Sequence, residues 1–219
     1  MACASRGVVC WRLVVSSRFL CFLLLLASPL AADEFWSWHT FDYPALQTGR
    51  WQAVVHGRVH VGYGKPSQGR LGPVVRYSLN KRVSLIGGYY FGEDYDRHGA
   101  WAMSHRSFGG AEVGLANRQW FRLTSRAYVE RFALYDKPDY FRHRARLRYT
   151  TAHKVAPVVV LEPFFDAHGL LTMRYSGGIR FTMTRGRALE VGYTYDQRRT
   201  NTGPPRHILT THYVFGRRE

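Results

Sequence analysis

The chain has 219 residues, with 31 lysines and arginines against 15 aspartates and glutamates, which gives a formal net charge of +16. Nucleic-acid binding is the usual reason for such a charge. Here the basic residues are spread through strand-like segments and are not gathered in one tail or helix face, which argues against a nucleic-acid partner. The length suits one domain that follows a leader.

Residues 1–32 have the parts of a secretory signal peptide. Three basic residues come first, at Arg6, Arg12 and Arg18. The apolar run 19–27 follows, and residues 29–32 supply small side chains for cleavage before Asp33. The run has about half of the ~20 apolar residues that a membrane helix needs. We therefore expect residues 1–32 to be cleaved and the mature chain to have no membrane helix.

Residues 33–49 contain a short aromatic stretch, 35–43, with the sequence FWSWHTFDY. The stretch has strand character, but it stands apart from the longer segments that follow. We consider two interpretations for residues 33–49: a periplasmic lead-in, or a first short strand. The number of strands in the rest of the chain bears on the choice.

Residues 50–219 alternate between polar and apolar positions. The pattern is clearest in YFRHRARLRY, where Arg142, Arg144, Arg146 and Arg148 take every second position. Residues that alternate with a period of two lie on opposite faces only in a β-strand. Strand character of this kind recurs at 50–63, 70–79, 82–92, 104–115, 118–132, 140–151, 155–165, 171–183, 187–198 and 205–216.

These segments predict an all-β fold, and specifically a closed antiparallel up-and-down transmembrane β-barrel formed by residues 50–219. Segments of about ten residues match a tilted membrane strand better than the five or six residues of a sandwich strand. Closure also removes edge strands, whose backbone groups a membrane interior would leave unsatisfied. Single-chain bacterial barrels normally have an even number of strands, so we expect about ten, with twelve as the alternative.

The connections between these segments alternate in length. Short ones lie at 80–81, 117–118, 152–154 and 184–186, and longer polar ones lie at 64–69, 93–103, 134–139, 166–170 and 200–204. Bacterial barrels carry short turns on the periplasmic side and longer loops outside. We therefore expect the short turns to face the periplasm.

Arginines outnumber acids on the even-numbered face, which we expect to point inward. The candidate interior residues are Arg106, Glu112, Arg122, Arg126, Glu130, Arg142, Arg144, Arg146, Arg148, Glu162, Arg174, Arg180 and Glu190. Two interpretations stay open. The first is a structural ion-pair network that fills the barrel, as side chains fill small barrels. The second is a narrow cationic passage that prefers anions.

An alternative class of function is an outer-membrane lipid hydrolase or acyl-modifying enzyme. His105 and Ser107 share one strand face, and a Ser/His pair is the core of many hydrolases. Both residues lie on the odd-numbered face, which we expect to point outward, and no acid completes the set there. We therefore do not favour an enzyme and assign no catalytic residue.

The sequence offers little for a metal or a cofactor. All three cysteines, Cys3, Cys10 and Cys21, fall within the leader, so we expect no disulfide and no thiolate chemistry in the mature chain. His56 and His60 are four residues apart, roughly 13 Å along a strand, which is too far to hold one ion together. We expect no metal site and no cofactor.

Several features together resemble one bacterial family. They are Trp36, the segment RAYVER at 126–131, the segment EPFF at 162–165 and the final strand from His207 to Phe215. In these features, and in its alternating arginines, the chain resembles the family called domain of unknown function 2490 over nearly all of the mature sequence. The resemblance implies an outer-membrane β-barrel and brings no substrate or active site.

The last segment also fits the signal that barrel assembly machinery reads, because Tyr213 and Phe215 alternate near the chain end. The charged residues of 216–219 follow, where many barrels stop at the aromatic residue. We therefore expect the bacterial outer membrane as the location. The expected partners are this machinery, outer-membrane lipids including lipopolysaccharide, and small anions.

Overall fold

The computed structural model describes residues 34–62, 65–95, 100–118, 120–134, 137–151, 153–199 and 203–216. The expected signal peptide, residues 1–32, lies outside the described residues. Within them, no helix is both long enough and apolar enough to cross a membrane. The fold below is that of the unit Glu34–Glu219.

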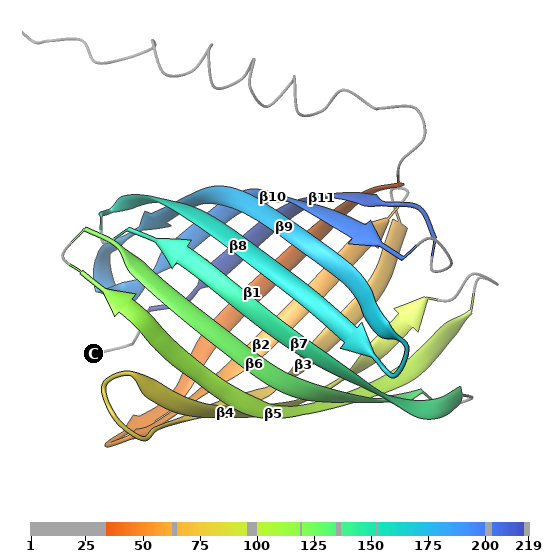
Figure 1. Ribbon diagram of the computed structural model, residues 1–219, viewed down its shortest axis with the longest axis horizontal. Coiled ribbons are helices and arrows are strands. Elements are labelled where there is room, and N and C mark those ends of the chain that lie inside the picture. Colours follow the sequence, from red (N-terminus) through yellow and green to blue (C-terminus); the bar gives the residue numbers. More distant parts are fainter. Residues whose placement is uncertain are drawn as a thin grey trace, which may run out of the picture. The chain divides into compact units, whose positions relative to one another are not determined.

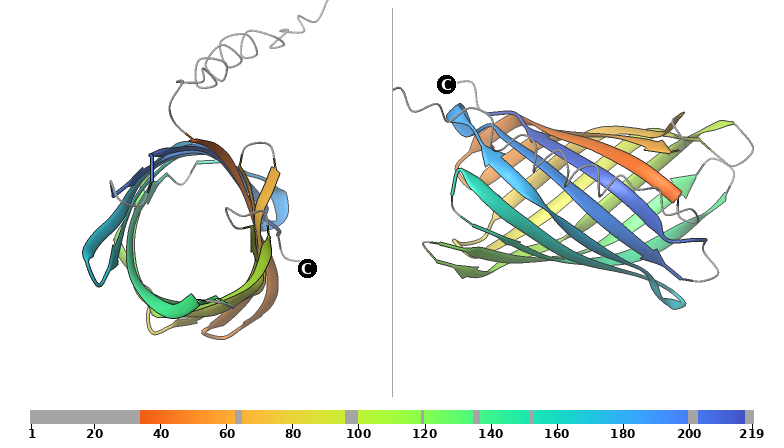
Figure 2. Two further views of the ribbon diagram at one scale, coloured as in Figure 1. Left: turned by 90° about the vertical axis from the view of Figure 1, so that its right-hand side faces the viewer. Right: turned by 90° about the horizontal axis from the view of Figure 1, so that it is seen from above.

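Eleven strands and one single-turn helix make up the described part of the chain. They are β1 (Glu34–Thr48), β2 (Trp51–Gly62), β3 (Lys65–Ser78), β4 (Val83–Tyr95), β5 (Trp101–Asn117), β6 (Arg122–Leu134), β7 (Lys137–Thr150), β8 (Val155–Asp166), β9 (Gly169–Thr182), η1 (Thr184–Gly186), β10 (Ala188–Arg198) and β11 (Arg206–Val214). The strands run obliquely around a common axis (Figure 1). Seen close to that axis, they form a ring (Figure 2).

Neighbouring strands pair in chain order, and the barrel closes between β1 and β11. Every pair of consecutive strands is antiparallel. The closing pair is parallel, with Glu34 opposite Arg206 and Asp42 opposite Val214. The prediction of an all-β, closed, up-and-down antiparallel barrel is therefore confirmed.

The described ranges hold one strand more than the ten that we preferred, because residues 34–48 form the 15-residue strand β1. Its inner and outer positions alternate like those of the other strands: Phe35, Phe41 and Tyr43 are exposed on the outside, while Trp36 and Trp38 are more covered. In an up-and-down barrel with an odd number of strands, the first and last strands run in the same direction. The seam between β1 and β11 must therefore be parallel.

The two faces of the sheet differ as the alternation predicts. In β8, Ala156, Val158, Val160, Glu162 and Phe164 are buried, while the residues between them point outward and are more exposed. Large apolar side chains are exposed on the outside of many strands, among them Val59, Leu85, Val129, Leu147 and Tyr175. The barrel therefore has an apolar outer wall and an inner wall that mixes charged and aromatic side chains.

We name the two ends of the barrel by the chain. The C-terminal end, where β11 ends, carries the connections 49–50, 79–82, 118–121, 151–154 and 183–187, and the N-terminal end is where β1 begins. The prediction of long loops at the N-terminal end is in part wrong, because the strands continue into the predicted loop segments. At this end, β2 and β3, β6 and β7, and β8 and β9 are each separated by two residues, at 63–64, 135–136 and 167–168. The connections 96–100 and 199–205 are longer.

Candidate functional site

The most buried charge inside the barrel is Glu130 of β6, whose side chain has 0% exposure. The register of the sheet brings three arginines to it: Arg142 of β7 stands directly opposite, and Arg106 of β5 and Arg144 of β7 are diagonal neighbours. Arg142 donates from Nε to Glu130 Oε2 at 2.7 Å, and Arg106 donates to Oε1. Nη1 of Arg144 lies 3.5 Å from Oε1.

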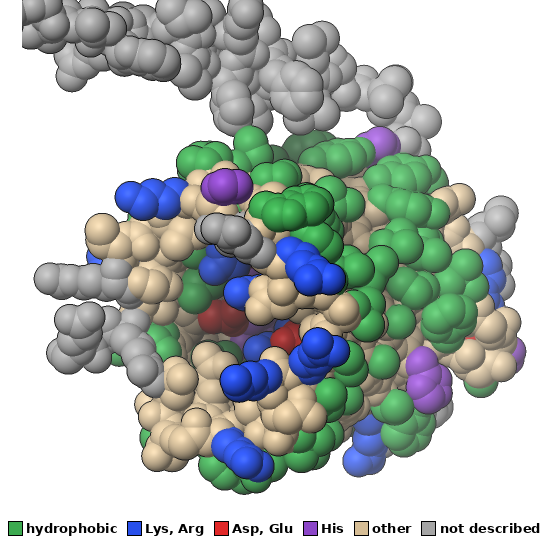
Figure 3. Space-filling view, turned by 60° about the vertical axis from the view of Figure 1, so that its left-hand side comes forward, with side chains coloured by type: hydrophobic (Ala, Val, Ile, Leu, Met, Phe, Trp, Pro, Cys, Tyr) green, Lys and Arg blue, Asp and Glu red, His purple; other side chains and the backbone are tan. Residues whose placement is uncertain are grey.

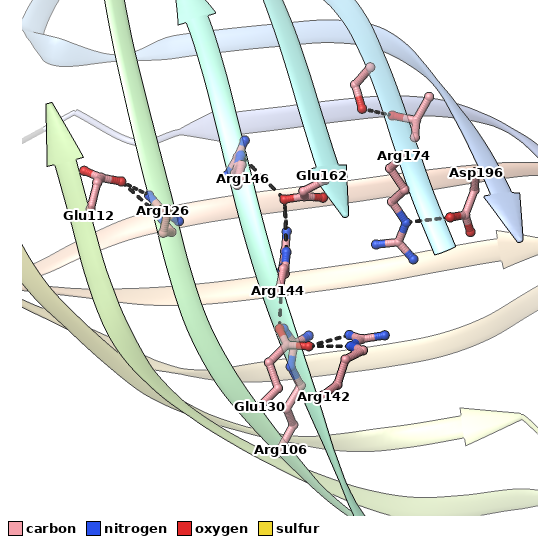
Figure 4. A network of polar contacts seen from close by, with 12 residues as sticks. Arg106, Glu112, Arg126, Glu130, Arg142, Arg144, Arg146, Glu162, Arg174 and Asp196 are labelled. Atoms are coloured by element: carbon pink, nitrogen blue, oxygen red, sulfur yellow. Dashed lines mark hydrogen bonds and ion pairs between the residues drawn. The ribbon is translucent and has the colours of Figure 1, made fainter. Parts of the chain in front are cut away.

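A second carboxylate, Glu162 of β8, extends this cluster. Arg144 donates from Nε to Glu162 Oε1 at 3.0 Å, so its side chain lies between Glu130 and Glu162 (Figure 4). Nε of Arg146 lies 3.6 Å from the same Oε1. Two carboxylates thus share four arginines across β5, β6, β7 and β8, an excess of positive charge within one connected network.

The other predicted acids also pair with arginines of other strands. Glu112 pairs with Arg126 at 2.8 Å from Nε and with Arg76 at 3.1 Å. Glu190 pairs with Arg180 at 3.1 Å and, across the interior from β10 to β7, with Arg148 at 2.5 Å. Alternation alone predicted the face but not this long-range pair.

Two arginines of the predicted set stand apart from those clusters. Arg174 of β9 donates from Nε to Asp196 of β10 at 2.9 Å, an acid at an even-numbered position of the inward face. Arg122, at the start of β6, is exposed at the C-terminal end and forms no ion pair with a described carboxylate. All thirteen predicted residues point to the inner side, and twelve of them take part in ion pairs.

Arginines and aromatic rings alternate across the interior in what we call the arginine–aromatic layer. Its members are Arg70, Phe132, Arg142, Phe164, Arg174, Trp38 and His60. Cζ of Arg142 lies 4.7 Å from the ring centroid of Phe132 and 4.5 Å from that of Phe164. Cζ of Arg174 lies 4.4 Å from the Phe164 centroid and 4.7 Å from the Trp38 ring. The rings of Trp38 and His60 stack at 4.3 Å.

This layer fills the N-terminal half of the interior. Phe164 has 0% exposure, Phe132 has 4% and His60 has 8%, so their rings are inaccessible from either end. These contacts join strands that are not neighbours in the sheet, since Arg70 of β3 contacts Phe132 of β6 and Arg174 of β9 contacts Trp38 of β1. Cation–π contacts between desolvated groups strengthen such packing.

The C-terminal half of the interior is hollow. A wide cavity of about 830 Å³ extends from Gln47, Gln52 and Thr150 near this end to Tyr90 and Arg106 in the middle of the barrel. Figure 3 looks toward this end and shows a depression in which basic and acidic side chains are visible, beside an apolar outer wall. The described interior is therefore closely packed around the arginine–aromatic layer toward the N-terminal end and hollow toward the C-terminal end.

A narrow cavity of about 190 Å³ lies between the wide cavity and the arginine–aromatic layer. Its wall includes Trp38 and Arg174 of the layer. Both cavities share a set of residues, namely His56, Arg58, Arg144, Arg146, Arg148, Glu190 and His212. The two spaces are thus lined by the same charged groups where they meet.

Asp42 of β1 joins two histidines in the wall of the wide cavity. Nδ1 of His56 lies 2.6 Å from Asp42 Oδ1, and Nε2 of His212 lies 3.0 Å from Oδ2. Sequence reasoning missed this group, because His212 reaches Asp42 through the parallel seam between β1 and β11. Among the described residues, no group of three or more His, Cys, Asp and Glu side chains is arranged to hold a metal ion.

The Ser/His pair lies outside the barrel, away from these cavities. Nδ1 of His105 lies 2.5 Å from the hydroxyl of Tyr89 on β4, and no hydrogen bond joins His105 to Ser107. Ser107 is exposed. In this arrangement the imidazole is not placed to take a proton from the serine.

Comparison with known proteins identifies the family. The family model described as protein of unknown function (DUF2490) matches residues 33–206. The chain belongs to this family. The matched range holds every arginine and carboxylate of the interior ion pairs described in this section.

Two further comparisons add little to this result. One solved structure is described by the words "Unveiling the Mechanism Behind the in-meso Crystallization of Membrane Proteins". Its similarity to this protein covers 71% of this chain and 68% of the other chain, at 12% sequence identity and a TM-score of 0.40. No curated protein matches.

Proposed function

We propose that the protein is an outer-membrane β-barrel with an interior that is braced by ion pairs and closed on one side. The observation that carries the proposal is the inversion of a soluble fold: apolar side chains such as Leu85 and Val159 are exposed outside, and Glu130 is fully buried inside. The strands have 9 to 17 residues, enough for the ~9–11 residues of a tilted membrane strand. The leader expected at 1–32 supports export.

The first role that we assign to the interior is structural. Glu130 joins arginines of β5 and β7, Glu162 joins β8 to β7, and the arginine–aromatic layer links β1, β2, β3, β6, β7, β8 and β9 across the interior. Such contacts fix the shape of a barrel that has no other core. They also obstruct a continuous water-filled passage.

A second role is suggested by the charge of the cavities. The wide cavity is lined by nine arginines and three acids, so that its field favours anions. If the C-terminal end of the barrel faces the periplasm, as the sequence predicts, the wide cavity opens there. We infer that small anions enter the wide cavity. We also propose that lipopolysaccharide contacts the outer wall and that the barrel assembly machinery binds the strands during insertion.

The membrane location predicts how the protein behaves during isolation. The mature chain should fractionate with outer membranes, require detergent for extraction and migrate faster on gels before boiling than after it, because a closed barrel resists detergent unfolding. Density fractionation and gel mobility measure both properties. Recovery as a soluble periplasmic monomer would overturn the proposal.

A charge on the outer wall gives a sharper test. Val129 lies midway along β6 with 41% exposure, a position where a soluble protein tolerates arginine. In a membrane, Val129→Arg should cost about 2–4 kcal/mol in folding free energy. Leu79→Arg, in an exposed turn at the C-terminal end, is the matched control and should cost little. Equal stabilities of the two variants in lipid vesicles would argue against a buried outer wall.

A further inference from the structure

Arg58 of β2 differs from the other arginines around the narrow cavity. Arg144 and Arg146 pair with Glu162, Arg148 pairs with Glu190, and Arg174 pairs with Asp196. Arg58 also lines both cavities, yet no described carboxylate lies within ion-pair distance of it, and no described residue hydrogen-bonds to its guanidinium. A charge that is largely removed from water without a partner is costly, so its retention needs a reason.

The charge balance of the narrow cavity points to an anionic occupant. Five arginines and two glutamates line it. Most of these side chains are well covered, with 11% exposure for Arg144 and 9% for Glu162, so water screens their charges poorly. A ligand with more than one negative charge would offset the excess better than a single carboxylate would.

The remaining wall supplies hydrogen-bond donors for oxygen atoms. Four hydroxyl-bearing residues of the inner face line the cavity, namely Thr40, Ser176, Thr194 and Thr210. Ser176 and Thr194 hydrogen-bond to each other at 2.7 Å, and Thr40 donates to the Thr211 carbonyl at 3.1 Å. Nε1 of Trp38 and Nε of Arg146 belong to the same wall, and neither buried atom has a hydrogen-bond partner among the described residues. Both groups only donate. Unmatched donors beside an unpaired guanidinium favour an acceptor-rich ligand.

Two facing glycines form part of the wall of the narrow cavity. Gly178 of β9 and Gly192 of β10 are directly opposite in the register, and both line the narrow cavity. A Cβ at Gly178 would lie 2.5 Å from the Val191 carbonyl oxygen, and one at Gly192 would lie 2.7 Å from that of Gly177. A larger residue at either position would force β9 and β10 apart, so both glycines are needed for the close approach of the two strands in this part of the cavity wall.

We propose that the narrow cavity is a binding site for a small, multiply charged oxyanion of the phosphate class, held by Arg58, Arg146 and the Trp38 N–H. Guanidinium groups bind phosphate through paired N–H donors, and hydroxyls complete such sites. A volume of about 190 Å³ admits inorganic phosphate or a small water-soluble phosphate monoester and excludes lipid acyl chains. The proposal deepens the anion-accepting role given to the interior above and does not depend on membrane location.

The test uses the mature full chain in a nonionic detergent and inorganic phosphate as the probe. Calorimetric titration at constant ionic strength should detect binding to the parent protein. Arg58→Gln should weaken it about tenfold or more, since a hydrogen bond to a charged group is lost. Without phosphate, Arg58→Gln should unfold at a higher temperature than the parent, because the unpaired charge is gone. At one phosphate concentration, the unfolding temperature should rise more for the parent than for the variant.

Two further variants separate the site from general charge. Arg82→Gln removes the same charge from an exposed turn at the C-terminal end and should bind phosphate as the parent does. Ser176→Phe keeps every charge but fills the narrow cavity, and it should abolish binding. Phosphate binding that survives both Arg58→Gln and Ser176→Phe would overturn the proposal.

Competition experiments identify the source of the phosphate group. Glycerol phosphate in solution should displace inorganic phosphate, and phosphatidic acid in the micelles should not. Displacement by the lipid alone would overturn the proposed soluble ligand. Absence of phosphate binding to a parent protein that fractionates with outer membranes and shifts on heating would overturn the site and leave the proposed barrel intact.

Discussion

Replacing Glu130 with alanine should destabilise the barrel by about 3–5 kcal/mol, the loss expected when one partner of a buried ion pair is removed. Glu130 has 0% exposure, and its carboxylate forms ion pairs with Arg106, Arg142 and Arg144. Without it, the guanidiniums of Arg106 and Arg142 keep their places beside Phe132 but lose their counter-charge. The repulsion among them adds to the cost.

The temperature at which the folded gel band disappears measures this loss, and urea unfolding in vesicles gives its free energy. Glu93→Ala is the matched control, because Glu93 is an exposed acid on β4. A second change, Arg142→Met in the Glu130→Ala background, should restore part of the stability by removing one of the cations that repel one another. If Glu130→Ala unfolds at the same temperature as Glu93→Ala, the network contributes nothing to stability.

The alternation of the sequence was sufficient to predict the fold class and the inward face of each predicted charge. In β6 and β7, Glu130 and Arg142 have the same parity, and the antiparallel register then places them opposite one another. Cross-strand ion pairs such as Glu112 with Arg126 follow from the same rule. The number of strands did not follow, since the even number of strands in other bacterial barrels argued against an eleventh strand at Glu34–Thr48, which closes the barrel through a parallel seam.

The layer and the cavities depend on distances across the barrel, which a period of two does not encode. Phe132 and Phe164 occupy even-numbered positions, where the pattern led us to expect polar side chains. An aromatic ring on the charged face was the signal available in the sequence for the arginine–aromatic layer. Arg58 stands at an even-numbered position, like the predicted interior arginines, but its lack of a described carboxylate partner became apparent only in three dimensions.

Removing the Phe164 ring should convert a closed barrel into a conducting one. Phe164 contacts Arg142, Arg144 and Arg174, so it holds the centre of the arginine–aromatic layer. We expect the parent protein to give no steady conductance in planar bilayers and Phe164→Ala to give discrete openings. Phe165→Ala is the matched control, because its neighbouring ring points outward with 40% exposure. Steady conductance of the parent would show that the layer does not close the barrel.

The current through Phe164→Ala should be carried by anions, because Arg144, Arg146 and Arg148 line both cavities on the way to the gap. Adding Arg144→Glu and Arg146→Glu should reverse or abolish this preference, which reversal potentials under a salt gradient measure. Replacing His105 and Ser107 with alanine should leave conductance and selectivity unchanged, since both lie on the outer side. A cation-selective current would contradict the role given to the arginines. Acyl release from lipids that is lost in Ser107→Ala would instead favour an enzyme.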